Sequence, residues 1–465
     1  MTSTNFSKGL FAGFVVIMVI LSTGCKKKNL HSRVVSVTDF GAKPNDKKDD
    51  TRSIQKALNH LGKSGGGILT IPKGIFMVSR RGPQYPGGIY IPSNVHVKGV
   101  GEGKSILKLQ ARQENYTRLI YVQEVRNVTI SNLTIDGNRY QQINPEAPNE
   151  HLHGILIHSA MGVTIKKCAF QNTAGDGILF NGPKVQSKNI TIRNCSFKDN
   201  RRNGITLGSG FNGVVIDSCY FDATNIFASS IDSEPEEGIC ENVKITNNTV
   251  INNKPAATLV TFGGHVPVSG YLVRNNKFEN TQLLFCNTID CEVYDNEITT
   301  QDPKEASIKV IYGNKDVVVR NNKINSHSKT YEAISTRDGI AGGVDLINNT
   351  IITTGKVGGY PIKLQGTQHL TIRDNFFKST NHLNKSAIYM RTTGPMKHVN
   401  IVDNTFEGYQ GYMDLQGYQK NTFNQGRINN VLKDVKDVEI KYIGSKEQLK
   451  AQYRLNKDLY KKSKN

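Results

Sequence analysis

The sequence predicts an all-β protein: a right-handed parallel β-helix (a solenoid) of about ten or more rungs, with a short N-terminal capping helix. Three observations lead to this fold class. A short phrase centred on Asn or Cys recurs at steps of 20 to 36 residues, which is typical of a repeat architecture. Apolar and polar residues alternate before each phrase, as in Val163-Thr164-Ile165, and this period indicates strands and not helices. Short strands at such a spacing stack into a coil.

The recurring phrase predicts what lies at one repeated turn of the coil. Its central residues are Asn132, Cys168, Cys195, Cys219, Asn248, Asn276, Asn296, Asn322, Asn349, Asn375 and Asn404. An Asn at this turn can hydrogen-bond to the same Asn one rung away, whereas a Cys packs there as a small buried group. We therefore expect an Asn ladder and three stacked Cys residues without disulfides. No spacing of Cys and His suggests a zinc site, and we expect no metal ligands.

Residues 1–25 have the pattern of a lipoprotein-type signal peptide. Lys8 precedes an apolar stretch from Leu10 to Leu21, which is too short to span a bilayer stably. The stretch leads into a sequence that resembles a bacterial lipobox, in which Cys25 would be lipidated and become the mature N-terminus. We therefore expect a protein of the bacterial cell envelope, anchored to the membrane by a lipid on Cys25, with residues 26–33 as a tether. Secretion without a lipid is the alternative.

Residues 34–420 are expected to form the β-helix domain, and the start of this domain has the pattern of a capping helix. Asp50 or Thr51 is placed to cap an amphipathic helix, whose apolar face carries Ile54, Ala57, Leu58 and Leu61. A solenoid needs such a lid, because its first rung would otherwise expose apolar core. Residues 421–465 lose the repeat and are rich in Lys, so we expect a basic C-terminal cap or tail.

The charge of the chain points to an anionic partner. Lys and Arg number 59 against 39 Asp and Glu, a formal net charge of +20. Such a charge favours nucleic acid, an anionic membrane surface or an acidic polysaccharide, although an evenly spread solubility charge is the bland alternative. We expect no nucleic acid partner, because the basic residues are not interleaved with an aromatic stacking platform.

A second strand of each rung can be aligned on a column of Ile residues that point inward, which leaves outward columns of polar side chains. We expect this face to line a groove that binds a polysaccharide. Its upper half carries cations that suit a uronate or a sulfate ester, namely Lys309, Arg337, Lys363 and Arg391. His158 lies in an outward column, and His153, Asp176 and Asn203 form a further column at the turn into the strand. An ordinary solvated face is the alternative.

Two carboxylates on one strand are the sharpest chemical signal. Asp232 and Glu234 point outward at positions i and i+2, roughly 6.5–7 Å apart along a strand. Glycoside hydrolysis needs two carboxyl groups at about 5–5.5 Å for retention or about 6.5–9.5 Å for inversion, and mutual repulsion would keep one of them protonated. Asp176, two rungs below, could assist. A loop of solvated acids is the alternative.

The start of the domain resembles the N-terminal signature of the pectate-lyase-like superfamily, which includes rhamnogalacturonase- and epimerase-like proteins. The resemblance is carried by Val37-Thr38-Asp39-Phe40-Gly41-Ala42, by the helix that follows, and by Gly65-Gly66-Gly67-Ile68-Leu69-Thr70-Ile71-Pro72. It implies the fold but not the reaction, since the superfamily holds hydrolases, lyases, epimerases and non-catalytic members. The polygalacturonase motifs are not met, because Asn172-Thr173 is followed by Ala174.

A second resemblance concerns the acids. Arg201-Arg202-Asn203-Gly204-Ile205 and Ile231-Asp232-Ser233-Glu234-Pro235 are similar to a pattern in a branch of carbohydrate-active right-handed β-helix proteins. It implies that Arg202, Asn203, Asp232 and Glu234 face the substrate.

The leading prediction is a glycoside hydrolase that acts on a polysaccharide, with Asp232 and Glu234 as acid and base or nucleophile and Asp176 assisting. Arg202, Asn203, His153 and His158 would contact the substrate. A hydrolase of this kind requires no cofactor. A polysaccharide lyase on an acidic glycan is the first alternative, with Lys309 or Arg337 as base and Ca²⁺ as a candidate cofactor. A non-catalytic glycan-binding or structural β-helix is the second. We expect a monomer.

Overall fold

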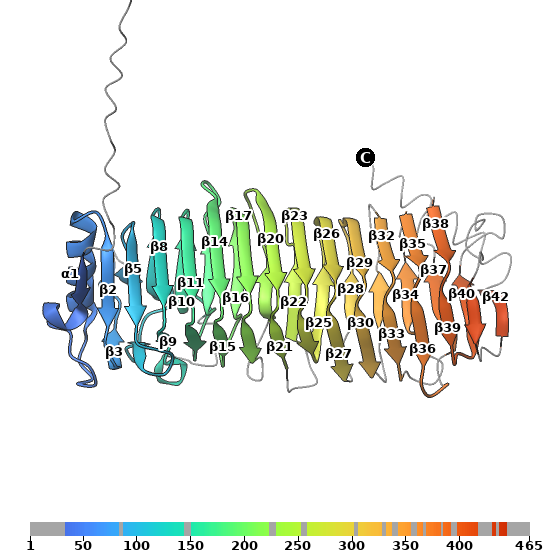
Figure 1. Cartoon of the computed structure of the whole chain (residues 1–465), viewed down its shortest axis with the longest axis horizontal. Helices are drawn as coiled ribbons and strands as arrows, with labels where there is room; N and C mark the ends of the chain where they lie inside the picture. The colour runs from blue at the N-terminus through green and yellow to red at the C-terminus, as the bar shows by residue number, and fades with distance from the viewer. Residues whose placement is uncertain are drawn as a thin grey trace, which may run out of the picture.

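The protein is an elongated parallel β-helix, seen from the side in Figure 1. The computed structural model describes residues 33–82, 87–143, 150–222, 229–252, 258–301, 306–327, 332–336, 343–354, 360–365, 369–382, 385–391, 398–416, 430–433 and 437–443. Within these ranges the strands form three sheets of 14 strands each, and every named pairing is parallel. Each rung contributes one strand to each sheet. The predicted all-β class and repeat architecture are confirmed.

The strands of each sheet follow one another from rung to rung. The first sheet contains β1 (Val34–Ser36), β2 (Gly67–Ile71), β5 (Val95–Gly99), β8 (Arg126–Ser131), β11 (Met161–Lys166), β14 (Ser187–Arg193), β17 (Phe211–Asp217), β20 (Cys240–Thr246), β23 (Val268–Arg274), β26 (Thr288–Tyr294), β29 (Lys315–Arg320), β32 (Gly343–Ile347), β35 (His369–Arg373) and β38 (His398–Val402). The second sheet contains β4 (Gly87–Tyr90), β7 (Arg118–Gln123), β10 (His153–His158), β13 (Ile178–Asn181), β16 (Ile205–Ser209), β19 (Ser229–Ser233), β22 (Thr258–Phe262), β25 (Thr281–Phe285), β28 (Ile308–Val310), β31 (Ile334–Thr336), β34 (Ile362–Gln365), β37 (Ile388–Arg391), β40 (Gly411–Gln416) and β42 (Asp437–Ile443). The third sheet contains β3 (Gly74–Val78), β6 (Ser105–Leu109), β9 (Thr134–Asp136), β12 (Ala169–Gln171), β15 (Ser196–Lys198), β18 (Tyr220–Asp222), β21 (Thr249–Ile251), β24 (Lys277–Glu279), β27 (Glu297–Gln301), β30 (Lys323–His327), β33 (Thr350–Thr353), β36 (Phe376–Ser379), β39 (Thr405–Glu407) and β41 (Val431–Lys433).

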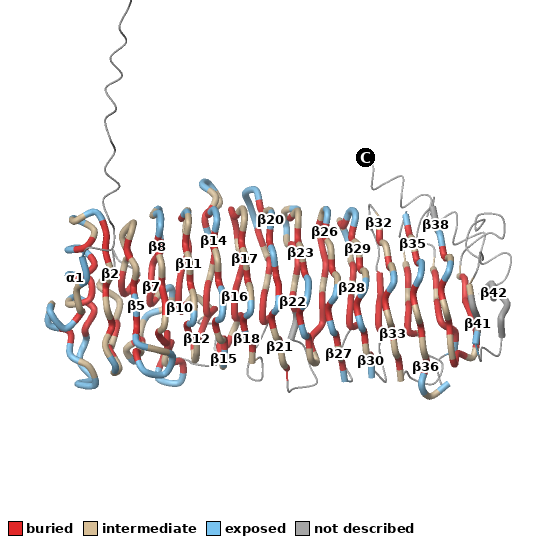
Figure 2. Tube along the Cα trace, viewed as in Figure 1, coloured by how far each residue is buried: buried red, intermediate tan, exposed pale blue. Residues whose placement is uncertain are grey.

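The core is a single apolar column that runs the length of the coil. In the second sheet, Ile155, Ile178, Ile205 and Ile231 lie in register, and each is at most 1% exposed. Figure 2 shows buried positions recurring along every rung. Phe170, Phe197 and Phe221 stack inside the third sheet with ring centroids 4.9 and 4.7 Å apart. The inward Ile column fixes the outward direction of the intervening side chains.

The corner that enters the third sheet carries the predicted ladder. From Asn248 onward, each Asn donates its amide N–H to the side-chain oxygen of the next, as between Asn322 and Asn349 at 3.0 Å. The ladder continues beyond the prediction to Asn430, which accepts from Asn404 at 3.1 Å. Below it, Cys168, Cys195 and Cys219 are buried and free, as predicted.

The prediction that Asn132 is the first residue of the ladder was wrong by one position. Lys166 lies opposite Ser131 and Ala169 opposite Thr134, so Leu133 occupies the rung position below Cys168. Asn132 precedes it with a φ of 57°, in the left-handed conformation that Asn tolerates. The same conformation recurs at Lys167, Asn194, Asn247 and their equivalents, so two adjacent columns of Asn meet at this corner.

A helix closes the N-terminal end of the coil, as predicted. The helix α1 (Thr51–Lys63) buries Ile54, Ala57, Leu58 and Leu61, each at 0% exposure. Asp50 is the N-cap residue, but its carboxylate does not cap the helix; it accepts from the backbone N–H groups of Lys43 and Met77 instead. Two short 3-10 helices, η2 (Val37–Phe40) and η3 (Arg139–Gln141), are the other helical elements in the described ranges.

The C-terminal end departs from the expected domain limit. Strands β41 and β42 extend the third and second sheets past residue 420, as far as Ile443. Cys25 and residues 1–32, on which the predictions of a signal peptide and a lipid anchor depend, lie outside the described residues, as do residues 444–465 at the end of the predicted basic tail. None of the helices in the described ranges is long and apolar enough to cross a membrane.

Candidate functional site

One group of the predicted site residues gathers where the chain enters strands β10, β13, β16 and β19 of the second sheet. At this corner His153, Asp176, Asn203 and Ser229 occupy successive rungs and are at most 3% exposed. Each of the first three side chains accepts a hydrogen bond from the backbone N–H of the next member, at 3.0, 3.2 and 2.8 Å. The column predicted from sequence therefore exists, and it is a buried polar ladder that fixes the backbone beneath the sheet face.

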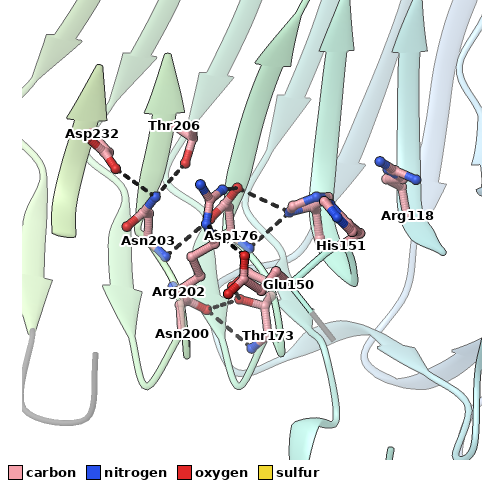
Figure 3. Close-up of polar contacts among 12 residues, drawn as sticks. Arg118, Glu150, His151, Thr173, Asp176, Asn200, Arg202, Asn203, Thr206 and Asp232 are labelled. Atoms are coloured by element: carbon pink, nitrogen blue, oxygen red, sulfur yellow. Dashed lines mark hydrogen bonds and ion pairs between the residues drawn. The ribbon is translucent and has the colours of Figure 1, made fainter. Parts of the chain in front are cut away.

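Asp176 is the centre of this arrangement (Figure 3). Its Oδ1 accepts the Asn203 backbone N–H, and its Oδ2 accepts from Nη1 of Arg202 at 3.0 Å. Arg202 then donates through Nη2 to Glu234, while the amide of Asn203 donates to Asp232 at 3.3 Å. One buried carboxylate thus positions two side chains, and each of them contacts one of the outward carboxylates.

Asp232 and Glu234 point away from the core. Ile231 and Ser233, which alternate with them, are 1% and 0% exposed, and Ser233 accepts a hydrogen bond from the buried Tyr271 hydroxyl. Asp232 lies opposite Thr206 on the rung below. The carboxylates therefore share the outer face, as their i and i+2 spacing predicts.

The two outward carboxylates have perturbed acidities. Burial, together with the charge of Glu234, raises the pKa of Asp232 from its usual 3.8 to about 7. Burial also raises the pKa of Glu234, but the Arg202 guanidinium opposes this shift. At neutral pH Asp232 is a ready proton donor. Glu234 is the carboxylate that Arg202 favours in its ionised form.

The buried members of the cluster stay in fixed charge states. Burial alone would raise the pKa of Asp176, but His153 and Arg202 outweigh it and hold that pKa below its usual range. Burial lowers the pKa of His153 despite the neighbouring carboxylate. Nδ1 of His153 lies 3.0 Å from the backbone nitrogen of Asp176 and 3.2 Å from its Oδ2, so the ring is in direct contact with this carboxylate. Nε2 is buried and has no hydrogen-bond partner in the part of the chain that the structure describes.

Three further residues border the cluster and escaped the sequence prediction. Glu150 lies just before β10, and its Oε2 is 3.9 Å from Nε of Arg202. His151 stacks on Tyr116 with centroids 4.3 Å apart, and Arg118 sits one rung below His153. For Glu150 and His151 the available signal was the stretch of residues 138–152, which lengthens one step of the repeat to 36 residues beside the site; Arg118 lies outside this stretch.

The other predicted substrate-binding residues lie elsewhere on the same sheet. His158 ends β10, and Lys309, Lys363 and Arg391 lie on β28, β34 and β37, several rungs above Asp232. The register confirms that Lys309 and Lys363 share the outward column of Asp232. Arg337 lies outside the described residues.

No metal site accompanies the carboxylates in the described ranges, where no three His, Cys, Asp or Glu side chains are grouped to hold an ion. A hollow of about 420 Å³ lies away from the cluster, beside α1, and is lined by Phe40, Arg52, Lys56, His60 and Lys63 among others. The carboxylates instead occupy the sheet face itself.

Two family models match successive parts of the chain. Residues 34–119 match "Rhamnogalacturonase A/epimerase, pectate lyase-like", and residues 118–324 match "Right handed beta helix region". With the parallel coil of three sheets, these matches place the chain in the pectate-lyase-like superfamily of right-handed β-helix proteins.

Particular relatives match over part of their length. The chain is similar to mannuronan C5-epimerase AlgE1 of Azotobacter vinelandii, with 28% identity over 267 residues, or 53% of this chain and 18% of that protein. It is also similar to alginate lyase 7 of the same organism, with 32% identity over 209 residues, or 42% of this chain and 24% of that protein. The chain thus spans at most about a quarter of the length of these two relatives.

Solved structures share the fold at low identity. The A-module of mannuronan C-5 epimerase AlgE6 of Azotobacter vinelandii has a TM-score of 0.61 at 17% identity, covering 87% of this chain and 99% of that one. The tailspike protein of Escherichia coli bacteriophage HK620, solved as a mutant with a hexasaccharide, has a TM-score of 0.55 at 15% identity, covering 88% and 80%. These likenesses establish the coil and nothing about the site.

Proposed function

We propose that the protein is a carbohydrate-active β-helix enzyme that hydrolyses glycosidic bonds of an acidic polysaccharide. The observation that carries this proposal is the outward pair Asp232 and Glu234, held from below by Asn203 and Arg202. Glycoside hydrolysis requires two carboxyl groups on one open face, and here one has a pKa of about 7 while the other is paired with an arginine.

The roles follow from the surroundings of each group. Asp232, with a pKa of about 7, donates a proton to the leaving oxygen as general acid. Glu234, paired with Arg202, acts as the base that activates water or as the nucleophile. Asp176 is buried and acts through Arg202 and Asn203, so it positions the reacting groups without touching the sugar.

The relatives support an acidic polysaccharide as the substrate class. The names of two sequence relatives refer to mannuronan and to alginate, and the fold relative from phage HK620 was solved with an oligosaccharide. This agrees with the net charge of +20 and with the cations on the upper rungs.

A polysaccharide lyase is the second candidate, and the match to alginate lyase 7 favours it. A lyase needs a base near the sugar ring and a group that neutralises the uronate carboxylate, a role for which Ca²⁺ is a candidate. Lys309, one of the bases suggested by the sequence, lies three rungs from Asp232, about 14 Å along the coil. A lyase that used Lys309 would therefore have its centre away from the paired carboxylates.

We further propose that the protein is anchored to the cell envelope through Cys25 and works as a monomer. Residues 26–33 span at most about 28 Å when fully extended, so the coil would stay close to the membrane surface. Labelling with a radioactive fatty acid, and its loss in Cys25→Ser, tests the anchor.

The test of the reaction is a screen of neutral, uronate and sulfated polysaccharides. It scores new reducing ends and ultraviolet absorbance for the wild type, for an Asp232→Asn/Glu234→Gln variant and for a Glu292→Gln/Glu297→Gln control. The control carboxylates are exposed on the other two sheets. Reducing ends without absorbance, lost only in the first variant, support a hydrolase. Absorbance supports a lyase, and binding without products supports the non-catalytic alternative.

A further inference from the structure

The outward column that contains Asp232 continues toward the C-terminal end of the second sheet. In register from rung to rung it reads Thr261, Leu284, Lys309, Ser335, Lys363, Tyr389 and Asp414. With rungs about 4.8 Å apart, Lys363 lies about 24 Å and Tyr389 about 29 Å from Asp232 along the coil. A polymer lying along this face would pass over both places (Figure 1).

A basic–aromatic patch surrounds Lys363 and Tyr389, made of Tyr360, Lys363, Lys385, Tyr389 and Arg391. The rings of Tyr360 and Tyr389 lie with centroids 4.7 Å apart and planes tilted by 36°. Lys385 places its Nζ 5.7 Å from the Tyr360 ring, and Arg391 follows Tyr389 by two residues on the same face of β37. The patch therefore combines ring surface with three cations.

The patch is held in place by groups beneath it. Asp414 is 1% exposed and accepts hydrogen bonds from the Tyr360 hydroxyl at 2.7 Å and from Ser386 Oγ at 2.9 Å. The Tyr389 hydroxyl donates a hydrogen bond to Oε1 of Gln416. Because both hydroxyls donate to side chains of β40, the ring geometry is set before any ligand arrives, which reduces the entropy cost of binding.

The charge of the patch is opposite to that of the carboxylate cluster. Lys363 forms an ion pair with Glu332 at 3.5 Å. The other two cations, Lys385 and Arg391, form no ion pair with a carboxylate among the described residues. At the cluster, Arg202 already contacts both Asp176 and Glu234. A sugar carboxylate or sulfate at the cluster would thus face acidic groups, whereas at the patch it would face cations.

We propose that the basic–aromatic patch binds an anionic sugar of the polysaccharide, a uronate or a sulfated ring, while the sugar at Asp232 and Glu234 is uncharged. The second half of this statement rests on the proposed function. An extended sugar advances by about one rung spacing, so the anionic sugar lies roughly five or six units from the cleaved bond. The substrate class is then a heteropolysaccharide with spaced charges, and not a polymer that is charged at every unit.

The test measures binding separately from cleavage, in the Asp232→Asn/Glu234→Gln background. The probes are polygalacturonate, chondroitin sulfate and a neutral galactomannan, compared by affinity electrophoresis and calorimetry at low and high salt. A Lys363→Gln/Tyr389→Ala/Arg391→Gln variant removes the patch. A Lys315→Gln/Lys323→Gln control removes two exposed lysines from the other two sheets. Circular dichroism and the melting temperature establish that each variant is folded.

We expect salt-sensitive binding to at least one anionic probe, weakened about tenfold or more in the patch variant and unchanged in the control. Equal affinity of parent and patch variants, equal losses in patch variant and control, or no binding to either anionic polymer would overturn the proposal. Binding that depends on the patch in a wild-type protein that cleaves nothing supports the patch and overturns the proposed hydrolysis alone.

The active protein provides the second readout. On a heteropolysaccharide that it cleaves, the patch variant should raise KM for long chains and leave kcat, and the cleavage of trisaccharides, unchanged. Cleavage with the same KM in the wild type and the patch variant would refute the patch while leaving the hydrolase intact. Efficient cleavage of polygalacturonate between two charged units would refute the uncharged sugar at the carboxylates.

Discussion

Replacing Asp232 by Asn should stabilise the protein at alkaline pH while abolishing its activity. The folded protein keeps the Asp232 carboxyl protonated up to a pKa of about 7, whereas the unfolded chain releases that proton near 3.8. Between these values the folded state binds more protons than the unfolded state. The contribution of Asp232 to the free energy of unfolding is therefore fully present below pH 3.8 and is lost as the pH rises to about 7.

The magnitude follows from the two pKa values. They differ by about 3, and a difference of one corresponds to about 1.4 kcal/mol, so the ionised Asp232 costs up to about 4 kcal/mol above pH 7. Asn has a similar shape and does not ionise. We therefore expect the free energy of unfolding of the variant minus that of the wild type to rise from about zero at pH 4 toward this value at pH 8.

The assay is urea unfolding followed by circular dichroism at five pH values between 4 and 8, with the difference taken from the midpoint and the slope m. Glu297→Gln is the matched control, because that carboxylate is exposed and forms an ion pair with Lys323 at the surface. A difference between Asp232→Asn and wild type that does not change with pH, or an equal change in the control, would refute the assignment of Asp232 as the acid that is protonated near neutrality.

Three further changes probe the site and the coil. Arg202→Lys should lower kcat/KM by about 10²-fold, because one ammonium cannot hold both Asp176 and Glu234. The Glu234 pKa then rises and moves the acidic limb of the pH–rate profile to higher pH, so an unchanged limb would contradict this prediction. Glu234→Gln should lower kcat by about 10³-fold or more. Since the Glu234 charge helps to raise the Asp232 pKa, the basic limb of the pH–rate profile of the residual activity should move to lower pH, and a shift to higher pH would argue against this coupling. Asn322→Ala leaves the Asn296 backbone N–H and the Val293 carbonyl without their ladder partner. Thermal and urea unfolding should therefore show that the free energy of unfolding falls by roughly 2–6 kcal/mol, and a fall below 1 kcal/mol would mean that the ladder contributes little to stability.

The fold was predictable because its determinants are local and repeated. The period-two alternation and the recurring Asn each specify a strand and a corner within one rung, and stacking copies of one rung requires no further information. The error at Asn132 arose at the first rung of the ladder, where Leu133 replaces the amide and two polar residues precede it. There the left-handed corner residue and the ladder residue cannot be told apart by residue type.

Most residues of the candidate site were predictable from the sequence, whereas their burial and their contacts were not. Outward Asp232 and Glu234 follow from the inward Ile231, because alternation along a strand is fixed. The burial of Asp176 and His153 does not follow, since the sequence gives no measure of how far a corner residue lies beneath the face. The basic–aromatic patch was only partly predictable. The alignment of strands placed Lys363 and Arg391 in outward columns, whereas Tyr360 contacts the patch from outside a strand.

The two adjacent columns of Asn at the ladder corner should age differently. Asn slowly loses its amide nitrogen in water and becomes Asp. The outer column is the one in the left-handed conformation, and the inner column is the hydrogen-bonded ladder. In the outer column this change is harmless, because Asp295, Asp374 and Asp403 already occupy it. In the inner column a carboxylate can no longer donate to the rung on either side, as Asn322 does to Val293 and Asn349. Deamidation of an inner Asn would therefore cost the coil hydrogen bonds between rungs, whereas deamidation of an outer Asn would produce a residue that the corner already contains.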